Sequence, residues 1–75
     1  MTFGVLGFYR NRDELVFEQD ISLSVEDLKP VMRWMNNQDH IGADFKLSAA
    51  QVREIEQLAS VVFPEGLDFY LTSHD

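Results

Sequence analysis

Apolar and polar residues alternate with a period of two at both ends of the chain and recur at helical spacing between the ends. Phe3–Arg10 and Glu14–Ile21 both show the alternation, and the turn-forming run Asn11–Asp13 separates them. Successive side chains of a strand point to opposite faces, so this pattern predicts a β-hairpin with two chemically different faces. We expect the rest of the fold to be arranged around this hairpin.

A turn centred on residues 11 and 12 pairs the apolar residues of the two strands across the hairpin. The pairs are Phe8 with Leu15 and Leu6 with Phe17, and these four side chains form the expected core face. The opposite face is predicted to mix apolar or aromatic side chains with carboxylates: Val5, Tyr9, Glu14, Val16, Glu18 and Asp20. A longer loop would shift the pairing but would leave Glu14, Val16 and Glu18 on one side.

The first helix is predicted to begin near Ser24, because the run Ser24–Asp27 is close to a capping box. Apolar residues at helical spacing follow it: Leu28, Val31, Met32 and Met35. Pro30 leaves two possibilities. With Ser24 as N-cap the proline lies inside the helix and the carbonyl of Glu26 loses its donor, whereas Asp27 as N-cap puts the proline in the first turn. We expect either a short opening turn followed by a helix from about residue 28, or one kinked helix.

The second half of the chain predicts a loop, a short extended segment, a helix and a strand. Asn36–Gly42 is a polar loop, and Asp44–Leu47 is a brief strand or a turn. The second helix begins at Ser48, with Gln51 as its capping-box partner, and Pro64–Gly66 ends it. Its expected buried stripe consists of Val52, Ile55, Leu58, Ala59 and Val62.

Leu67–Thr72 alternates again and predicts the last strand, followed by a frayed tail at residues 73–75. Its core-facing residues are Leu67, Phe69 and Leu71, and its outward residues are Asp68, Tyr70 and Thr72. If this strand joins the hairpin, Asp68 and Tyr70 continue the acidic face. The expected fold is a single α+β domain over residues 1–75. It has a small antiparallel sheet, made by the N-terminal hairpin and the C-terminal strand, with or without a short fourth strand, and two helices pack on one face of this sheet.

The charge of the chain narrows the classes of partner. Thirteen Asp and Glu against six Lys and Arg give a formal net charge of −7. Nucleic acid and anionic membranes are bound through cationic patches, so the charge argues against both and favours a basic protein partner. Alternatively, the charge serves only to keep a small protein soluble. No apolar run reaches the length of a membrane span and no targeting segment is present, so we expect a cytoplasmic location.

Residues that could carry chemistry are few. The absence of cysteine excludes disulfides, thiolate catalysis and zinc–thiolate sites. Asp39, His40 and Asp44 are ligand types that metals use, but they lie in a loop without a fixed scaffold, so a metal-binding regulator is only a third hypothesis. Gly4 and Gly7 indicate a bulge or close packing in the first strand. We expect no enzymatic activity, no metal and no cofactor.

The outer face of the sheet is the candidate contact surface. Tyrosine offers a large contact area and loses little side-chain entropy on binding, which suits a surface that binds protein. The predicted partner-binding residues are Tyr9, Glu14, Val16, Glu18, Asp20, Asp68, Tyr70 and Trp34. Trp34 lies off the centre of the helical stripe, so it is either half buried at the stripe's edge or a partner anchor. An ordinary solvated sheet face in an acidic protein is the alternative interpretation.

Several short stretches together resemble a family of small uncharacterised bacterial proteins. They are Gly7–Phe8, Asp13–Glu18, Leu23–Leu28, Lys46–Gln51 and Leu67–Leu71. Proteins of this kind are often encoded beside polymorphic or contact-dependent growth inhibition toxins and look like immunity proteins. The resemblance spans nearly the whole chain, although Pro30 and the loop at 36–42 depart from it. It implies an antitoxin-like cytoplasmic inhibitor that blocks a cognate toxin domain, and it carries over no catalytic residue.

Two functional hypotheses therefore stand at this point. In the first, the chain is an immunity protein whose acidic, tyrosine-containing face binds a cationic toxin domain, for example a nuclease. In the second, it is a small structural module that self-associates through an uncovered sheet face or a strand edge. The first hypothesis expects the free chain to be a monomer or a weak dimer, and the second expects a stable dimer.

Overall fold

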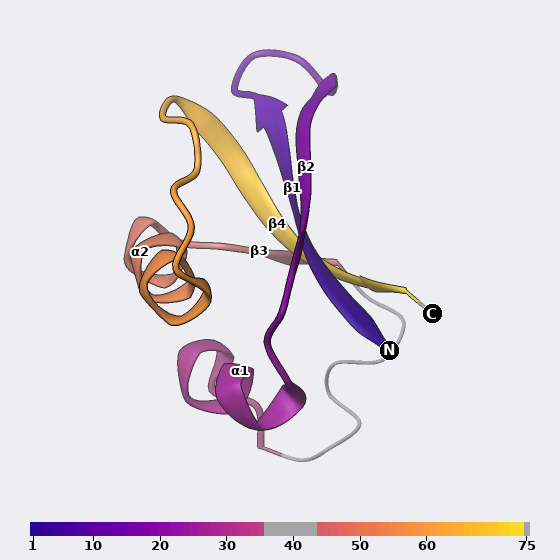
Figure 1. The fold of residues 1–75 in the computed structure, drawn as a ribbon. Helices are drawn as coiled ribbons and strands as arrows, with labels where there is room; N and C mark the ends of the chain where they lie inside the picture. Colours follow the sequence, from indigo (N-terminus) through magenta and orange to yellow (C-terminus); the bar gives the residue numbers. More distant parts are fainter. Residues whose placement is uncertain (36–43, 75) are drawn as a thin grey trace.

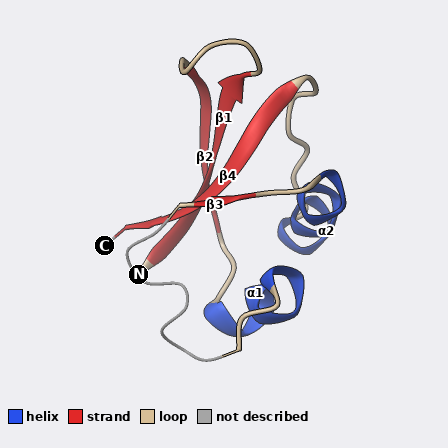
Figure 2. Cartoon of the chain, turned by 180° about the vertical axis from the view of Figure 1, so that it is seen from behind, coloured by secondary structure: helices blue, strands red, loops and turns tan. Residues whose placement is uncertain are grey.

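The computed structural model of the protein describes residues 1–35 and 44–74. Their elements, in chain order, are β1 (Thr2–Tyr9), β2 (Leu15–Ile21), α1 (Val25–Met32), β3 (Phe45–Lys46), α2 (Ala49–Ala59) and β4 (Leu67–His74). The strands form one antiparallel sheet in the order β2-β1-β4-β3, and both helices lie on the same side of it (Figures 1 and 2). The predicted α+β fold is confirmed, and β3 is its short fourth strand.

The core fills the space between one sheet face and the two helices. Its buried members are Phe3, Val5, Ile21, Leu28, Val31, Leu47, Ile55, Phe63, Phe69 and Leu71. Val5 and Leu71 are opposite one another on β1 and β4 and are fully buried, as are Leu28 on α1 and Ile55 on α2. Each element thus contributes its apolar stripe or face to one cluster, as expected for a domain with a single core.

The predicted core face of the hairpin is wrong. Phe8 pairs with Leu15 as expected, but Leu6 lies opposite Glu18, and Phe17 lies opposite Gly7. A β-bulge opposite Gly7 and Phe8 causes the difference, because it inserts one extra residue into β2. The residues of β2 after the bulge therefore lie opposite different residues of β1 than expected, and Phe17 changes to the other face. Phe17 packs on the core, whereas Leu6, Phe8 and Leu15 do not belong to it. The predicted outward position of Val5 is also wrong, because the helices pack on the face of β1 that carries Phe3 and Val5.

Gly7 lies at this bulge and leaves room for a cluster of aromatic rings. A Cβ at Gly7 would be 2.9 Å from Leu67 Cδ1 and 3.1 Å from Phe17 Cβ and Phe69 Cε1. The rings of Phe17, Phe63 and Phe69 pack against one another, with centroids 5.6–6.1 Å apart. The predicted bulge and close packing are therefore both confirmed at Gly7.

The first helix begins as the Ser24 alternative predicts. The Ser24 side chain accepts from the Asp27 amide, and the Asp27 carboxylate accepts from the Ser24 amide, which completes a capping box. Pro30 therefore lies inside α1. The helix ends at Met32, with Arg33 left-handed at the C-cap, so Met35 falls beyond it. Met35 was expected on the buried stripe and is instead 90% exposed.

The second helix has the predicted Ser48–Gln51 capping box but ends earlier than predicted. Ser60 adopts a left-handed conformation after Ala59, so the helix stops before Pro64. Val62 lies past the end of the helix and is 86% exposed, and Leu58 is also exposed. The predicted buried positions of these two residues are wrong, and Phe63 fills the space below the helix instead.

Strand β4 sorts its side chains as predicted and is longer than predicted. Phe69 and Leu71 are buried, whereas Asp68, Tyr70 and Thr72 alternate with them. Ser73 and His74 belong to the strand and not to a frayed tail, because they pair with Phe3 and Thr2 of β1. Residue 75 and the predicted loop at 36–42 lie outside the described residues. Neither described helix is long and apolar enough to cross a membrane.

Alanine at Gly7 should destabilise the fold by about 1–3 kcal/mol, the usual cost of overpacking a core. The new methyl group meets Leu67, Phe17 and Phe69 at 2.9–3.1 Å, which these packed side chains cannot all relieve. Gly4→Ala is the comparison and should cost less, because the nearest atom to its Cβ is the exposed Asp20 carboxylate at 3.2 Å, which can move away at the expense of one exposed contact with His74. Urea unfolding measures both, and equal losses of stability would contradict the packing described.

Ile55→Ala should cost about 2–5 kcal/mol of stability, because it removes a large side chain from the centre of the core. Leu58→Ala on the same helix should cost less, about 1 kcal/mol, because that side chain is 48% exposed and does not belong to the buried core. Thermal unfolding of the two variants compares them directly. A larger loss of stability for Leu58→Ala than for Ile55→Ala would contradict the structure and support the buried stripe predicted from the sequence.

Candidate functional site

The sheet face turned away from the helices has an apolar centre on β1. Leu6 and Phe8 lie on this face, and no described element covers it (Figure 2). We call it the open face. The register assigns to it Thr2, Gly4, Leu6, Phe8, Leu15, Glu18, Asp20, Lys46, Asp68, Tyr70, Thr72 and His74. Phe8 and Tyr70 pack edge to face with ring centroids 5.5 Å apart, so adjacent strands hold two aromatic side chains in a fixed arrangement.

Carboxylates surround this apolar centre. Glu18 lies opposite Leu6 on β2, and it makes no ion pair within the part of the chain that the structure describes. Asp68 lies opposite Phe8 on β4, and its carboxylate is 3.9 Å from the guanidinium of Arg10. Lys46 is opposite Tyr70 on β3, at the other edge of the sheet. The open face is therefore most acidic toward β2 and the hairpin end.

A contact between β2 and β4, the two neighbours of β1, crosses the open face above Gly4. His74 Nε2 on β4 lies 3.0 Å from Asp20 Oδ1 on β2, although β1 runs between the two strands. Gly4 makes this possible, because a Cβ there would be 3.2 Å from Asp20 Oδ1. The contact ties the two strands together at the end of the sheet opposite the hairpin turn.

Four of the predicted binding residues lie together, and the others are spread. Glu18, Asp20, Asp68 and Tyr70 share the open face, as predicted. At the hairpin end, Val16 is exposed beside the bulge, and Glu14 is 3.7 Å from Arg12. Tyr9 alternates with Phe8 and so points to the helix side, where it remains half exposed and lies under Arg12 at 5.9 Å. The register therefore does not place Tyr9 on the open face as predicted, but Tyr9 does line a hollow at the hairpin end together with Phe8 and Tyr70.

Trp34 lies on the helix side of the sheet and not with the other candidates. Its ring centroid is 6.0 Å from that of Phe3 and 5.5 Å from that of Phe45. Trp34 is half buried at the edge of the core, which agrees with the half-buried position predicted for it and not with an exposed partner anchor. A partner seated on the open face would therefore not touch it.

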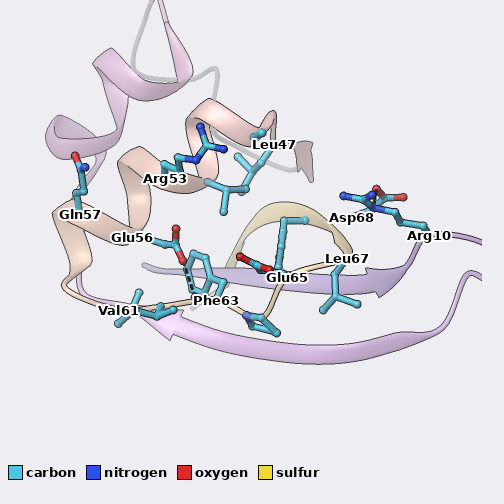
Figure 3. Close-up of a pocket in the computed structure, with 16 residues that line it drawn as sticks. Arg10, Leu47, Arg53, Glu56, Gln57, Val61, Phe63, Glu65, Leu67 and Asp68 are labelled. Carbon is cyan, nitrogen blue, oxygen red and sulfur yellow. Dashed lines mark hydrogen bonds and ion pairs between the residues drawn. The ribbon is translucent and has the colours of Figure 1, made fainter.

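A groove of about 1060 Å³ lies beside α2, between this helix, the segment that follows it and the ends of β1 and β4 (Figure 3). Val52, Val61, Phe63 and Leu67 are among its apolar lining residues. Glu56 faces into it but already accepts a hydrogen bond from the Phe63 amide at 2.7 Å. The described lining residues include no Ser, Cys or His, so this groove offers no such nucleophile or base.

A second, smaller hollow of about 340 Å³ opens at the hairpin end of the open face. Phe8, Tyr9 and Tyr70 form its aromatic part, and its charged lining residues are Arg10, Arg12, Asp13, Asp44 and Asp68. Within the described ranges, no three or more His, Cys, Asp and Glu side chains are placed to hold a metal ion. Asp39 and His40, two of the three metal candidates, lie outside those ranges.

Sequence reasoning missed Leu6 and Phe8, which were assigned to the core. The signal that could have corrected this is the pair Gly4 and Gly7, because glycine inside a strand indicates a bulge or a close approach. A bulge after Gly7 transfers Phe17 to the side of Val5 and leaves Leu6 beside Glu18. The position of the bulge on β2 is set by packing and has no sequence marker there.

Comparisons with known proteins add a family but no function. No curated protein and no solved structure matches the chain. A family described as a domain of unknown function, DUF7683, matches residues 5–72, which include both helices, all of β2 and β3 and most of β1 and β4. The chain therefore belongs to the DUF7683 family.

Proposed function

We propose that this protein is an immunity protein that binds a basic toxin domain through the open face and neutralises it in the bacterial cytoplasm. The observation that carries the proposal is an uncovered sheet face with Leu6, Phe8 and Tyr70 at its centre and three carboxylates around them. The protein acts by binding alone and needs no catalytic residue, metal or cofactor. A partner that covers the face would complete the second apolar layer that this small sheet lacks.

The composition of the open face supports a protein partner. Aromatic side chains held in place by neighbouring strands lose little entropy on binding, and such residues often dominate binding energies. Phe8 and Tyr70 are fixed in this way and are only half buried. A polar rim around an apolar centre is the usual anatomy of a protein–protein interface.

The charge of the surface supports a basic partner. Glu18, Asp20 and Asp68 lie on this face, and the whole chain carries a formal charge of −7. Nucleases bind phosphates through cationic clefts, so a face of this kind could occupy such a cleft in place of nucleic acid. The choice of a toxin as the partner rests on the resemblance of the chain to immunity proteins.

Self-association through the same face is the second candidate, and the exposed apolar centre is the observation that favours it. A two-fold dimer uses the same patch on both copies, so it would bring the carboxylates of one copy against those of the other. Among the described residues, Lys46 and His74 lie on this face and Arg10 and Arg12 lie at its hairpin end, but His74 already contacts Asp20 and Arg10 already contacts Asp68. This electrostatic cost favours a basic partner over a second copy.

The double variant Glu18→Lys/Asp68→Lys should bind the toxin at least about a hundredfold more weakly, because close charge pairs across an interface are often worth more than 1.5 kcal/mol each. The test partner is the C-terminal domain encoded immediately upstream of the gene. Co-expression measures survival of the host and co-purification of the two chains, and titration calorimetry then measures the affinity.

The matched control is Glu26→Lys/Glu54→Lys, which changes the net charge by the same amount on the two helices, away from the open face. It should protect the host as well as the unchanged protein does. Equal loss of protection in both double variants would mean that total charge, and not the open face, determines binding. Cells that die with the unchanged protein present, and no complex, would reject the proposal for that domain.

The free protein should be a monomer at micromolar concentration, since no basic partner is present to cover the open face. Size-exclusion chromatography with light scattering at low and high salt measures its mass. A dimer that persists at both salt concentrations would support the self-associating module instead. In that case Phe8→Ser should dissociate it, because the substitution removes an aromatic side chain from the apolar centre.

A further inference from the structure

Strand β2 forms one edge of the sheet. The strand order places β1 on one side of β2 and no described strand on the other (Figure 1). β2 runs for seven residues, from Leu15 to Ile21, whereas β3 at the opposite edge has two residues. A long edge strand presents a row of backbone groups that can pair with a further extended chain.

The register shows which backbone groups of β2 point away from the sheet. The Tyr9 amide donates to the Glu14 carbonyl, so Tyr9 turns its backbone groups toward β2, and by alternation Gly7, Val5 and Phe3 do the same. Their partners Phe17, Gln19 and Ile21 therefore bond to β1. Glu18 and Asp20 direct their amide and carbonyl groups outward.

The side chains along this edge are acidic and apolar. Glu18 and Asp20 lie on the open face two residues apart, a distance of about 7 Å along a strand. Near the hairpin end, Leu15 and Val16 are 47% and 41% exposed, although both are aliphatic. These two side chains give the edge an apolar contact surface next to its carboxylates.

The same charges oppose pairing with a second copy of the chain. An antiparallel β2–β2 pair that uses the outward groups would place Glu18 opposite Asp20, or one of them opposite its own copy. Like charges directly opposite on neighbouring strands are destabilising. A strand with lysine or arginine at alternate positions would instead place a cation beside each carboxylate.

We propose that the outer edge of β2 binds an extended, basic segment of the partner, which joins the sheet as a fifth strand. Its lysine or arginine side chains lie on the open face beside Glu18 and Asp20, and an apolar residue farther along contacts Val16 or Leu15. The backbone hydrogen bonds provide attachment, and the alternate cations select the sequence. This inference rests on the proposed function, because it specifies which part of the basic partner meets the open face and how.

A synthetic peptide of about ten residues, the length of a long strand, provides the first test. Lysine alternates in it with valine or threonine. It is compared with two peptides that have the same side chains but methylated backbone amides. One carries N-methyl groups on the backbone amides of its lysines, and the other carries them on the backbone amides of its valine or threonine residues. Only one of these two sets of amides can face β2, so one methylated peptide should bind at least about tenfold more weakly than the other.

Amide exchange and chemical shifts measured by NMR place the peptide on the protein. The Glu18 and Asp20 amides should gain protection from exchange when the unmodified peptide binds. Equal affinity of the two methylated peptides would overturn the inference, because binding would then depend on charge and not on backbone pairing. No binding of the unmodified peptide at low salt would overturn it as well.

Two variants of one residue test the edge with the upstream-encoded domain. Glu18→Pro and Glu18→Ala both remove the carboxylate, but only proline removes the outward amide, and proline is tolerated where an edge amide faces water. Glu18→Pro should bind the domain at least about tenfold more weakly than Glu18→Ala does. Circular dichroism checks that both fold, and if the proline variant does not, the peptide pair alone decides.

Asp68→Lys separates this inference from the proposed function. Asp68 lies on β4, two strands away from the β2 edge. If Asp68→Lys weakens binding while Glu18→Pro and Glu18→Ala bind equally well, the open face still binds the partner and the edge inference is wrong. If Asp68→Lys has no effect and the proline variant alone fails, the partner binds at the edge without the open face.

Discussion

Burial of one face of β1 and β4 under two short helices is the constraint on which the rest of the structure depends. Val5, Leu71, Leu28 and Ile55 meet in the centre of the core without exposure to solvent. Helices of eight and eleven residues can cover one face of this sheet, and no described element covers the other. Because Val5 points to the helices, Leu6 and Phe8 must point away from them. The open face therefore has its apolar centre as a direct consequence of how the core is built.

The bulge beside Gly7 adds a second consequence, at the hairpin end. It lets Phe17 pack with Phe63 and Phe69 on the core while Phe8 still pairs with Leu15 on the other side. The extra residue leaves Leu15 and Val16 exposed at the sheet edge. Local strand geometry thus produces, on adjacent surfaces, the apolar centre of the open face and the acidic and apolar edge of β2. The two proposals concern these neighbouring surfaces.

Local signals in the sequence predicted much of this fold. The capping box at Ser48 is predicted from the sequence, and the one at Ser24 is one of two alternatives there, because each box depends on residues three positions apart. The alternation of β4 was also sufficient, because Phe69 and Leu71 are its strongest apolar pair. The same reasoning fails for the hairpin, because β1 has apolar residues on both of its faces, Phe3 and Val5 on one and Leu6 and Phe8 on the other. Only tertiary packing decides which of these two faces is buried. The ends of both helices were missed because left-handed Arg33 and Ser60 carry no glycine signal.

Mapping a bound partner onto the two sides of the sheet tests the central claim most directly. Amide chemical shifts of the labelled protein would be recorded with and without the upstream-encoded domain. Binding through the open face predicts the largest changes at Leu6, Phe8, Glu18 and Tyr70, which lie on that face, and small changes along α1 and α2. The largest changes along the groove beside α2, with the open face unaltered, would contradict it.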